Sequence, residues 1–193
     1  RLVEQGKVRA IGCSNQDTYG LTKSLWMADR NGTARYETIQ NNYSLNARRF
    51  EDELASVCKR EQVSLLAYSP IGGGVLSGKY LNGAWPEGAR FSGYRGAAPR
   101  NRVMTDRFVN ERTLASTARF VELAREFGLS PVTFAVAWVL THEFVGSAII
   151  GVSRPSPRRP RAPRRRRSRV RAPARGRQRR SWPNRPSERP RSR

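Results

Sequence analysis

The strongest constraint on the fold is an alternation of two patterns along the first 150 or so residues. Short runs of apolar and β-branched residues alternate with segments whose apolar residues recur at helical spacing. Strands that alternate with helices form parallel sheets, and nearly continuous apolar runs are typical of strands covered by helices. The order therefore predicts an α/β fold. The expected strands are 9–15, 37–43, 64–69 and 147–152.

The segments between these strands carry helix signals. Leu21 and Leu25 recur at helical spacing, Gly128 is a typical residue just after a helix, and Ser130 followed by Pro131 is a typical helix start. The expected helices are 17–30, 48–61, 111–127 and 131–142.

Residues 75–108 are rich in Gly and Pro and predict a long loop, a feature that is usually functional or disordered.

Small and polar residues gather where the strands end. Ligands bind at the carboxyl ends of the strands in α/β barrels and open α/β sheets alike. The pattern predicts an α/β ligand-binding protein of about half a (β/α)8 barrel. The strand-end groups are Ser14-Asn15, 40–42, Tyr68-Ser69 and 151–154.

The formal charge of +22 is unevenly distributed. Residues 1–154 hold 20 Lys and Arg against 14 acidic residues, whereas residues 155–193 hold 17 Arg against one acidic residue. The second segment also has eight prolines, and Val170 and Trp182 are its large apolar residues. Such a composition cannot form a packed core. We therefore expect a globular part over 1–154 and a disordered Arg/Pro-rich tail over 155–193.

Two interpretations of the tail stay open. An arginine-rich segment attracts phosphates, which predicts a disordered arm with at least incidental nucleic-acid binding. Alternatively, 17 arginines without a single lysine are typical of a GC-rich gene translated out of frame. We favour the frameshift.

The remaining composition points to a cytoplasmic protein without a metal site. Cys13 and Cys58 are isolated, so we expect reduced thiols rather than a disulfide framework or metal ligands. No apolar run is long enough to cross a membrane. The chain begins at Arg1, in what we interpret as the end of a helix, so we expect a fragment.

Four motifs resemble those of the aldo-keto reductase family, in the family's order. The segment 6–15, GKVRAIGCSN, is similar to the fifth-strand signature, and 40–44, QNNYS, to the sixth strand. Residues 66–80 resemble the seventh strand with its cofactor loop, and 147–154 the eighth strand. The resemblance covers residues 1–154 and is strongest to the bacterial subfamily related to potassium-channel β subunits. It implies strands 5–8 of the barrel.

The resemblance implies a site for NADPH. In the family, Ser14, Asn15 and Gln40 would hydrogen-bond the nicotinamide carboxamide, and Tyr68 would stack on the ring. Amide and hydroxyl groups suit a neutral carboxamide, and an aromatic face suits a flat heterocycle. The alternative for Tyr68 is that it only fills the barrel mouth.

The phosphates of the cofactor would lie beside a glycine-rich turn, whose small residues let backbone N–H groups approach. Ser153 and Arg154 would meet the 2′-phosphate, beside Gly151, which favours NADPH over NADH. The alternatives are a merely flexible turn over 72–74 and, at Lys79 and Arg90, solvated surface residues. The implied pyrophosphate residues are Ser69, Pro70, Ile71, Gly73 and Gly74, with Lys79 and Arg90 as additional cations.

The catalytic residues of the family are expected to lie upstream of Arg1. The family reduces carbonyls with a Tyr proton donor assisted by Lys, Asp and His from its first four strands. No such set can be assigned here, so we expect Tyr43 to pack and His142 to lie at the surface. Without a positioned proton donor, this chain alone should be an inactive part of an enzyme that reduces small-molecule aldehydes or ketones. An assay of NADPH oxidation with an aldehyde tests this expectation.

Two other functions stay open. One is nucleic-acid binding through the tail, and the other is an NADPH-binding module without catalysis, like the channel β subunits.

Four strands would leave two open sheet edges, so we expect marginal folding, aggregation or pairing with another half-barrel.

The tail hypothesis makes a direct prediction. Residues 155–193 carry 17 of the arginines, so truncation after Arg154 should abolish binding to single-stranded DNA. Binding by the full chain should fall linearly in log–log form as salt rises, because counterions are released. Fluorescence anisotropy at several salt concentrations measures both effects. Retained, salt-sensitive binding by the truncated chain would place the contact in residues 1–154 instead.

Overall fold

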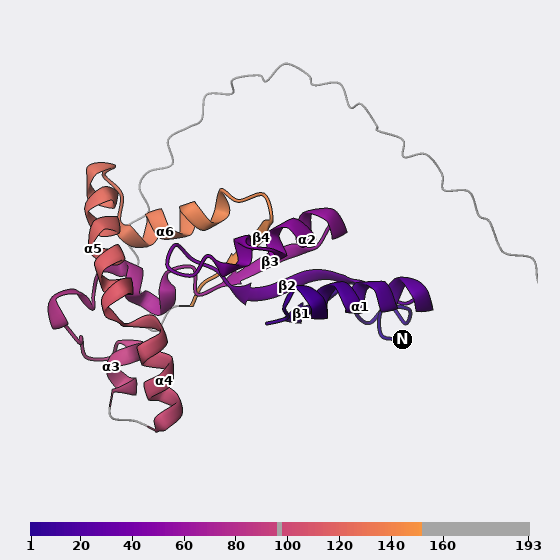
Figure 1. The fold of residues 1–193 in the computed structure, drawn as a ribbon, viewed down its shortest axis with the longest axis horizontal. Helices are drawn as coiled ribbons and strands as arrows, with labels where there is room; N and C mark the ends of the chain where they lie inside the picture. Colours follow the sequence, from indigo (N-terminus) through magenta and orange to yellow (C-terminus); the bar gives the residue numbers. More distant parts are fainter. Residues whose placement is uncertain (96–97, 152–193) are drawn as a thin grey trace, which may run out of the picture. The chain divides into compact units, whose positions relative to one another are not determined.

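The sheet at the centre of the fold has four parallel strands. The computed structural model describes residues 1–95 and 98–151. Neighbouring strands follow the chain order, so each connection crosses over to the next strand (Figure 1). This arrangement confirms the expected parallel α/β fold and is consistent with part of a (β/α)8 barrel. The strands are β1 (Ile11–Ser14), β2 (Tyr36–Asn42), β3 (Ser64–Tyr68) and β4 (Val145–Ile149).

One face of this sheet is covered by three helices, α1 (Thr18–Asn31), α2 (Leu54–Glu61) and, beside β4, α6 (Pro131–Leu140). Leu21 and Leu25 of α1 pack with Ile39 of β2 in a cluster that also holds Leu65, Ala67 and Cys58. Burial of apolar area of this kind contributes about 25 cal/mol per Å². The apolar positions of the strands and of α1 therefore meet as their spacing indicates.

The start and end of α1 follow from local chemistry. The Asp17 side chain accepts a hydrogen bond from the Gly20 N–H at 2.7 Å and caps the helix. Gly32 ends the helix with a φ of 62°, a left-handed conformation that costs glycine little. The helix is thus delimited by residues whose roles can be recognised in the sequence.

The opposite face of the sheet is open to solvent over much of its area. The pairing places Ser14, Gln40, Leu66 and Ser147 side by side in one row across the four strands. Ser14, Gln40 and Ser147 are exposed. A second row, nearer the carboxyl ends of the strands, joins Asn42, Tyr68 and Ile149.

The expected helix over 48–61 is broken in the structure. A 3-10 helix, η1 (Arg49–Glu51), comes first, and α2 starts only after Glu53. Glu53 has a φ of −139°, which no helix accommodates. Apolar spacing could not reveal the break, because Phe50 is buried on the near side of it and Cys58 on the far side.

The expectation of a long loop over 75–108 is wrong. This stretch holds two 3-10 helices and two α-helices, and Tyr80, Phe91 and Phe108 pack together through their rings. Pro99 starts the second α-helix, a position that suits proline. Glycine and proline therefore mark helix ends here. The elements are η2 (Gly72–Ser77), η3 (Leu81–Gly83), α3 (Arg90–Tyr94) and α4 (Pro99–Phe108).

The last helices, α5 (Glu111–Glu126) and α6 (Pro131–Leu140), pack on each other and on η2. Phe120 of α5 stacks on Phe134 of α6 with ring centroids 5.2 Å apart. In the described ranges no single helix is long and apolar enough to cross a membrane. Taken together, α5 and α6 have the required length and apolar composition, but the pair is bent by 95°. The final strand starts two residues before the expected 147.

Close approach of β1 to β2 makes Gly12 a test of this packing. A Cβ at Gly12 would lie 2.7 Å from the Thr38 carbonyl oxygen, so Gly12→Ala should destabilise the fold by about 1–3 kcal/mol. Gly93→Ala is the control, since its Cβ would meet nothing within 4 Å. Urea denaturation measures both changes. Equal midpoints for the two variants would contradict the close strand contact.

Candidate functional site

A group of polar side chains lies where β1, β2 and β3 end. Asn15 follows β1 in the left-handed region, with a φ of 55°. Its N–H donates to the Gln40 carbonyl oxygen at 3.1 Å and to Asn41 Oδ1 at 2.8 Å. Asn tolerates this conformation better than most residues. Asn15 is thereby held at the carboxyl edge of the sheet.

Tyr68, at the end of β3, joins this group through its side chain. The Tyr68 hydroxyl donates a hydrogen bond to Asn15 Oδ1 at 3.0 Å. Its aromatic ring is half-buried and lies on the open face of the sheet, in the row that also contains Asn42. The bond occupies the oxygen of the Asn15 amide and leaves the amide NH2 without a partner among the described residues.

Ser14 and Gln40 lie opposite each other on neighbouring strands of the same face. The Ser14 hydroxyl donates to the Gln40 carbonyl oxygen at 2.9 Å. The Gln40 side chain is exposed and makes no hydrogen bond within the described part of the chain. The structure therefore brings Ser14, Asn15, Gln40 and Tyr68 together, and an amide group there is free to bind.

The chain after Tyr68 turns sharply. Ser69 has a φ of 56°, and Gly72, Gly73 and Gly74 all have positive φ values of 58° to 102°. Three successive glycines suit this conformation because it is strained for most other residues. Pro70 is fully buried, which anchors the turn against the rest of the fold.

Side chains pack closely against the glycine turn. A Cβ at Gly73 would lie 2.7 Å from the Phe91 ring, and a Cβ at Gly74 would lie 2.9 Å from Lys79 Nζ. The exposed Lys79 side chain therefore lies beside the turn, with its Nζ 5.3 Å from the Tyr80 ring centroid. Arg90 is the exposed first residue of α3, next to Phe91.

The remaining implied cofactor residues are at the end of the described chain. Gly151 follows β4 and is exposed. Ser153 and Arg154 lie outside the described residues, as do residues 155–193 of the expected tail.

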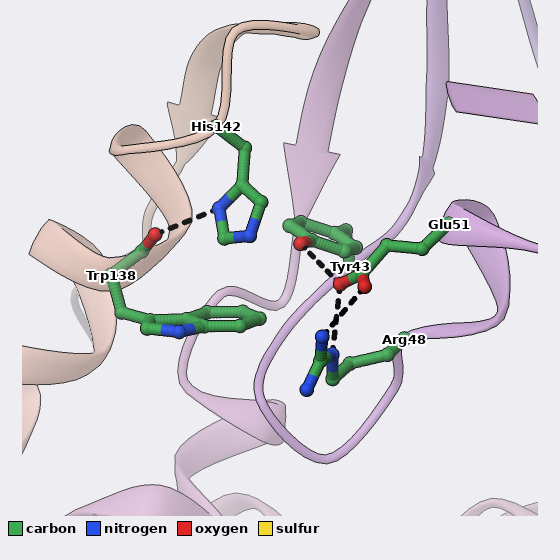
Figure 2. A network of polar contacts seen from close by, with 5 residues as sticks. All are labelled: Tyr43, Arg48, Glu51, Trp138 and His142. Carbon is green, nitrogen blue, oxygen red and sulfur yellow. Dashed lines mark hydrogen bonds and ion pairs between the residues drawn. The ribbon is translucent and has the colours of Figure 1, made fainter. Parts of the chain in front are cut away.

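A second polar network lies beside the end of β2 (Figure 2). The buried Tyr43 hydroxyl donates to Glu51 Oε1 at 2.7 Å, and Arg48 donates to both Glu51 oxygens at 2.8 and 2.7 Å. The Tyr43 ring stacks on Trp138 of α6, and the Arg48 guanidinium lies 5.5 Å from that indole ring. The network ties the end of β2 to α6.

From the sequence, we expect Tyr43 to have a packing role and His142 to lie at the surface. Tyr43 is fully buried, as the expected packing role requires. The expectation that His142 is a surface residue is wrong, because its half-buried ring contacts Tyr43, Trp138 and Phe144. Sequence patterns could not reveal this contact, because it forms only when the residues after α6 fold back onto the end of β2.

The electrostatics of this network follow from the Arg48–Glu51 pair. The Arg48 guanidinium lowers the pKa of Glu51 below its ordinary value. Burial, reinforced by the Glu51 carboxylate, raises the pKa of Tyr43. Tyr43 is consequently a neutral hydrogen-bond donor, which makes proton release by this hydroxyl unfavourable.

The cysteines and acidic residues show no reactive or metal-binding arrangement in the described ranges. Cys13 and Cys58 are free, and burial raises the pKa of Cys58 to about 11. A thiol with such a pKa is unreactive at neutral pH. No group of three His, Cys, Asp or Glu side chains that could hold a metal occurs in these residues.

Comparison with known proteins gives a consistent picture. The model of the aldo/keto reductase family matches residues 1–157. Protein tas of Escherichia coli (strain K12) is 43% identical over 151 residues, which cover 77% of this chain and 40% of that protein. The chain therefore spans about two fifths of the length of this curated relative.

Two further relatives differ in their described roles. A probable voltage-gated potassium channel subunit beta of Arabidopsis thaliana is 28% identical, with 80% of this chain and 46% of that protein covered. An NADH-specific methylglyoxal reductase of Escherichia coli (strain K12) is 27% identical, with 80% and 43% covered.

The Glu51 network predicts a pH dependence of stability. Because the folded-state pKa of Glu51 is lowered, its contribution is present above the unfolded pKa of about 4.3 and is lost as pH falls through the folded-state value. Glu51→Gln should lower stability at pH 7 by on the order of 1 kcal/mol. The deficit should shrink toward pH 3. Thermal unfolding at both pH values measures it, with the exposed Glu122→Gln as control. A pH-independent deficit would contradict the role of this charge.

Proposed function

The chain belongs to the aldo/keto reductase family, a family of oxidoreductases, and we propose that residues 1–154 form the cofactor-binding side of an NADPH-dependent reductase. The parent enzyme would convert aldehydes or ketones to alcohols by hydride transfer. The observation that carries this proposal is the Tyr68–Asn15 hydrogen bond, which joins an aromatic ring to a free amide on the open face of the sheet.

The polar group at the strand ends fits a nicotinamide. Asn15 has an amide NH2 available to donate, and the exposed Gln40 side chain can both donate and accept. A carboxamide needs both kinds of partner. The half-buried Tyr68 ring offers a face for the flat heterocycle beside them.

The glycine turn fits a pyrophosphate. The Gly72 and Gly74 N–H groups donate to backbone carbonyl oxygens within the turn, at 2.8 and 3.0 Å. The Gly73 N–H has no partner among the described residues, so it is available to a phosphate oxygen. Lys79 places a positive charge beside Gly74, where a phosphate oxygen would come close.

NADPH, when bound, supplies the hydride. The residues of this chain would orient the nicotinamide ring and hold it against Tyr68. The proton for the product alcohol would come from the catalytic Tyr that the family carries on its first strands. Under this proposal the chain alone binds the cofactor and lacks the acid catalyst.

The choice of NADPH over NADH is the finer part of this proposal. It is based on Ser153 and Arg154, which lie outside the described residues. The guanidinium group of an arginine matches the oxygens of a phosphate in shape. One relative is named as NADH-specific, so the two cofactors should be compared directly. We also propose a small-molecule carbonyl substrate for the parent enzyme and a location in the reducing cytoplasm. Nucleic-acid binding by residues 155–193 stays a prediction from charge.

The cofactor site is tested by substitution of Tyr68. Tyr68→Ala should weaken NADPH binding about tenfold, or roughly 1.4 kcal/mol, because both the ring face and the hydrogen bond to Asn15 are lost. Tyr68→Phe should cost less, since it keeps the ring. The control is Tyr19→Ala at a side chain 74% exposed on α1. The increase in NADPH fluorescence on binding measures all three.

Two results would contradict the proposal. One is unchanged NADPH affinity in a folded Tyr68→Ala variant, with folding checked by circular dichroism. The other is an equal loss in Tyr19→Ala, which would indicate binding away from the carboxyl ends of the strands.

A further inference from the structure

A cavity lies beside the glycine turn, with Gly72 in its wall. Its volume is about 800 Å³, and its wall is formed by the segment after β2 and by the corner between α4 and α5. Ser14, Asn15, Gln40 and Tyr68 are not part of this wall. The cavity is therefore not the site for the nicotinamide.

Hydrogen bonds hold the two sides of this cavity together. The Asn46 side chain, in the segment after β2, accepts from the Ser116 hydroxyl at 2.8 Å. The same amide donates to Thr117 Oγ1 at 3.3 Å. Ser116 and Thr117 belong to α5, so the opposite walls are fixed relative to each other.

The wall has an excess of positive charge. Four arginines face two carboxylates, Glu51 and Asp52, which leaves a formal excess of two positive charges. Arg48 is already held by Glu51 through two hydrogen bonds (Figure 2). Within the part of the chain that the structure describes, the other three make no ion pair. These are Arg49, Arg107 and Arg112.

The amino end of α5 adds to this positive field. Asn110 caps the helix and lines the cavity, together with Thr113 of the first turn. A helix of this length carries about half a positive charge at its amino end. Glu111 is in the same turn but is not part of the cavity wall. Backbone N–H groups at such an end are a common anion site.

Two buried polar atoms in the wall have no partner. Ser44 is fully buried, and its Oγ makes no hydrogen bond among the described residues, as is true of Asn42 Oδ1. Unpaired buried polar atoms are costly and rare in folded proteins. Both residues line the cavity, and the Ser44 hydroxyl can donate a hydrogen bond to an anionic oxygen.

We propose that this cavity binds the phosphate group of a small organic phosphate. The excess of two positive charges matches a phosphate monoester, which carries between −1.5 and −2 at neutral pH. Guanidinium groups match phosphate oxygens in shape, and three arginines of the cavity wall make no ion pair among the described residues. The cavity shares Gly72 with the glycine turn, so it adjoins the proposed pyrophosphate position, but none of the four residues proposed to bind the nicotinamide lines it.

The test is calorimetric titration of the full chain with inorganic phosphate at constant ionic strength. Arg112→Gln and Arg107→Gln should each weaken phosphate binding at least about tenfold. The matched controls are Arg119→Gln on α5 and Arg102→Gln on α4, both exposed and outside the cavity wall. Phosphate bound by residues 155–193 would be the same in all variants, so the differences report on the cavity.

The outcomes separate clearly. Weaker phosphate binding in the two cavity variants alone, with unchanged NADPH affinity, supports the site. Equal phosphate affinity in the wild type and all four folded variants overturns it. An equal loss in cavity and control variants also overturns it, since it would show general attraction to positive charge. Loss of NADPH binding without loss of phosphate binding would assign the arginines to the cofactor instead.

Discussion

The parallel register of β1, β2 and β3 is the constraint on which the candidate site depends. It sets Ser14 beside Gln40 and Asn42 beside Tyr68, so their side chains share one face and one edge of the sheet. A slip of one residue would turn each of these side chains to the helix-covered face. The free energy that holds the register therefore also positions the polar groups.

Two kinds of contact maintain this register from different sides. Behind the sheet, Leu21 and Leu25 of α1 pack on Ile39 and exclude water. At the carboxyl end of β2, the Tyr43 N–H donates to the Tyr68 carbonyl oxygen at 3.3 Å, while its hydroxyl is held by Glu51. Tyr43 thus joins the end of β2 to the end of β3 without reaching the open face itself.

The sequence allowed the architecture and the main cluster to be predicted, because both depend on local patterns. Strand ends show as polar residues after apolar runs, and Ser130 and Pro131 mark a helix start through their own chemistry. The Glu51 network and the arginine-lined cavity could not be predicted. Both depend on contacts between residues that are distant in the chain, such as the contact of Arg48 with the Trp138 ring. The pattern of a single sequence does not show which distant residues meet. The helices in 75–108 were missed because aromatic packing outweighs the low helix propensity of that stretch.

The most direct test of the central claim is a crystal structure of the chain with NADP⁺. The nicotinamide should lie on the open face of the sheet, with its carboxamide within hydrogen-bond distance of Asn15 and Gln40 and its ring against Tyr68. The pyrophosphate should lie along residues 69–74. A cofactor bound elsewhere, or bound with its nicotinamide away from the ends of β1 to β3, would contradict the assignment of this half of the fold to cofactor binding.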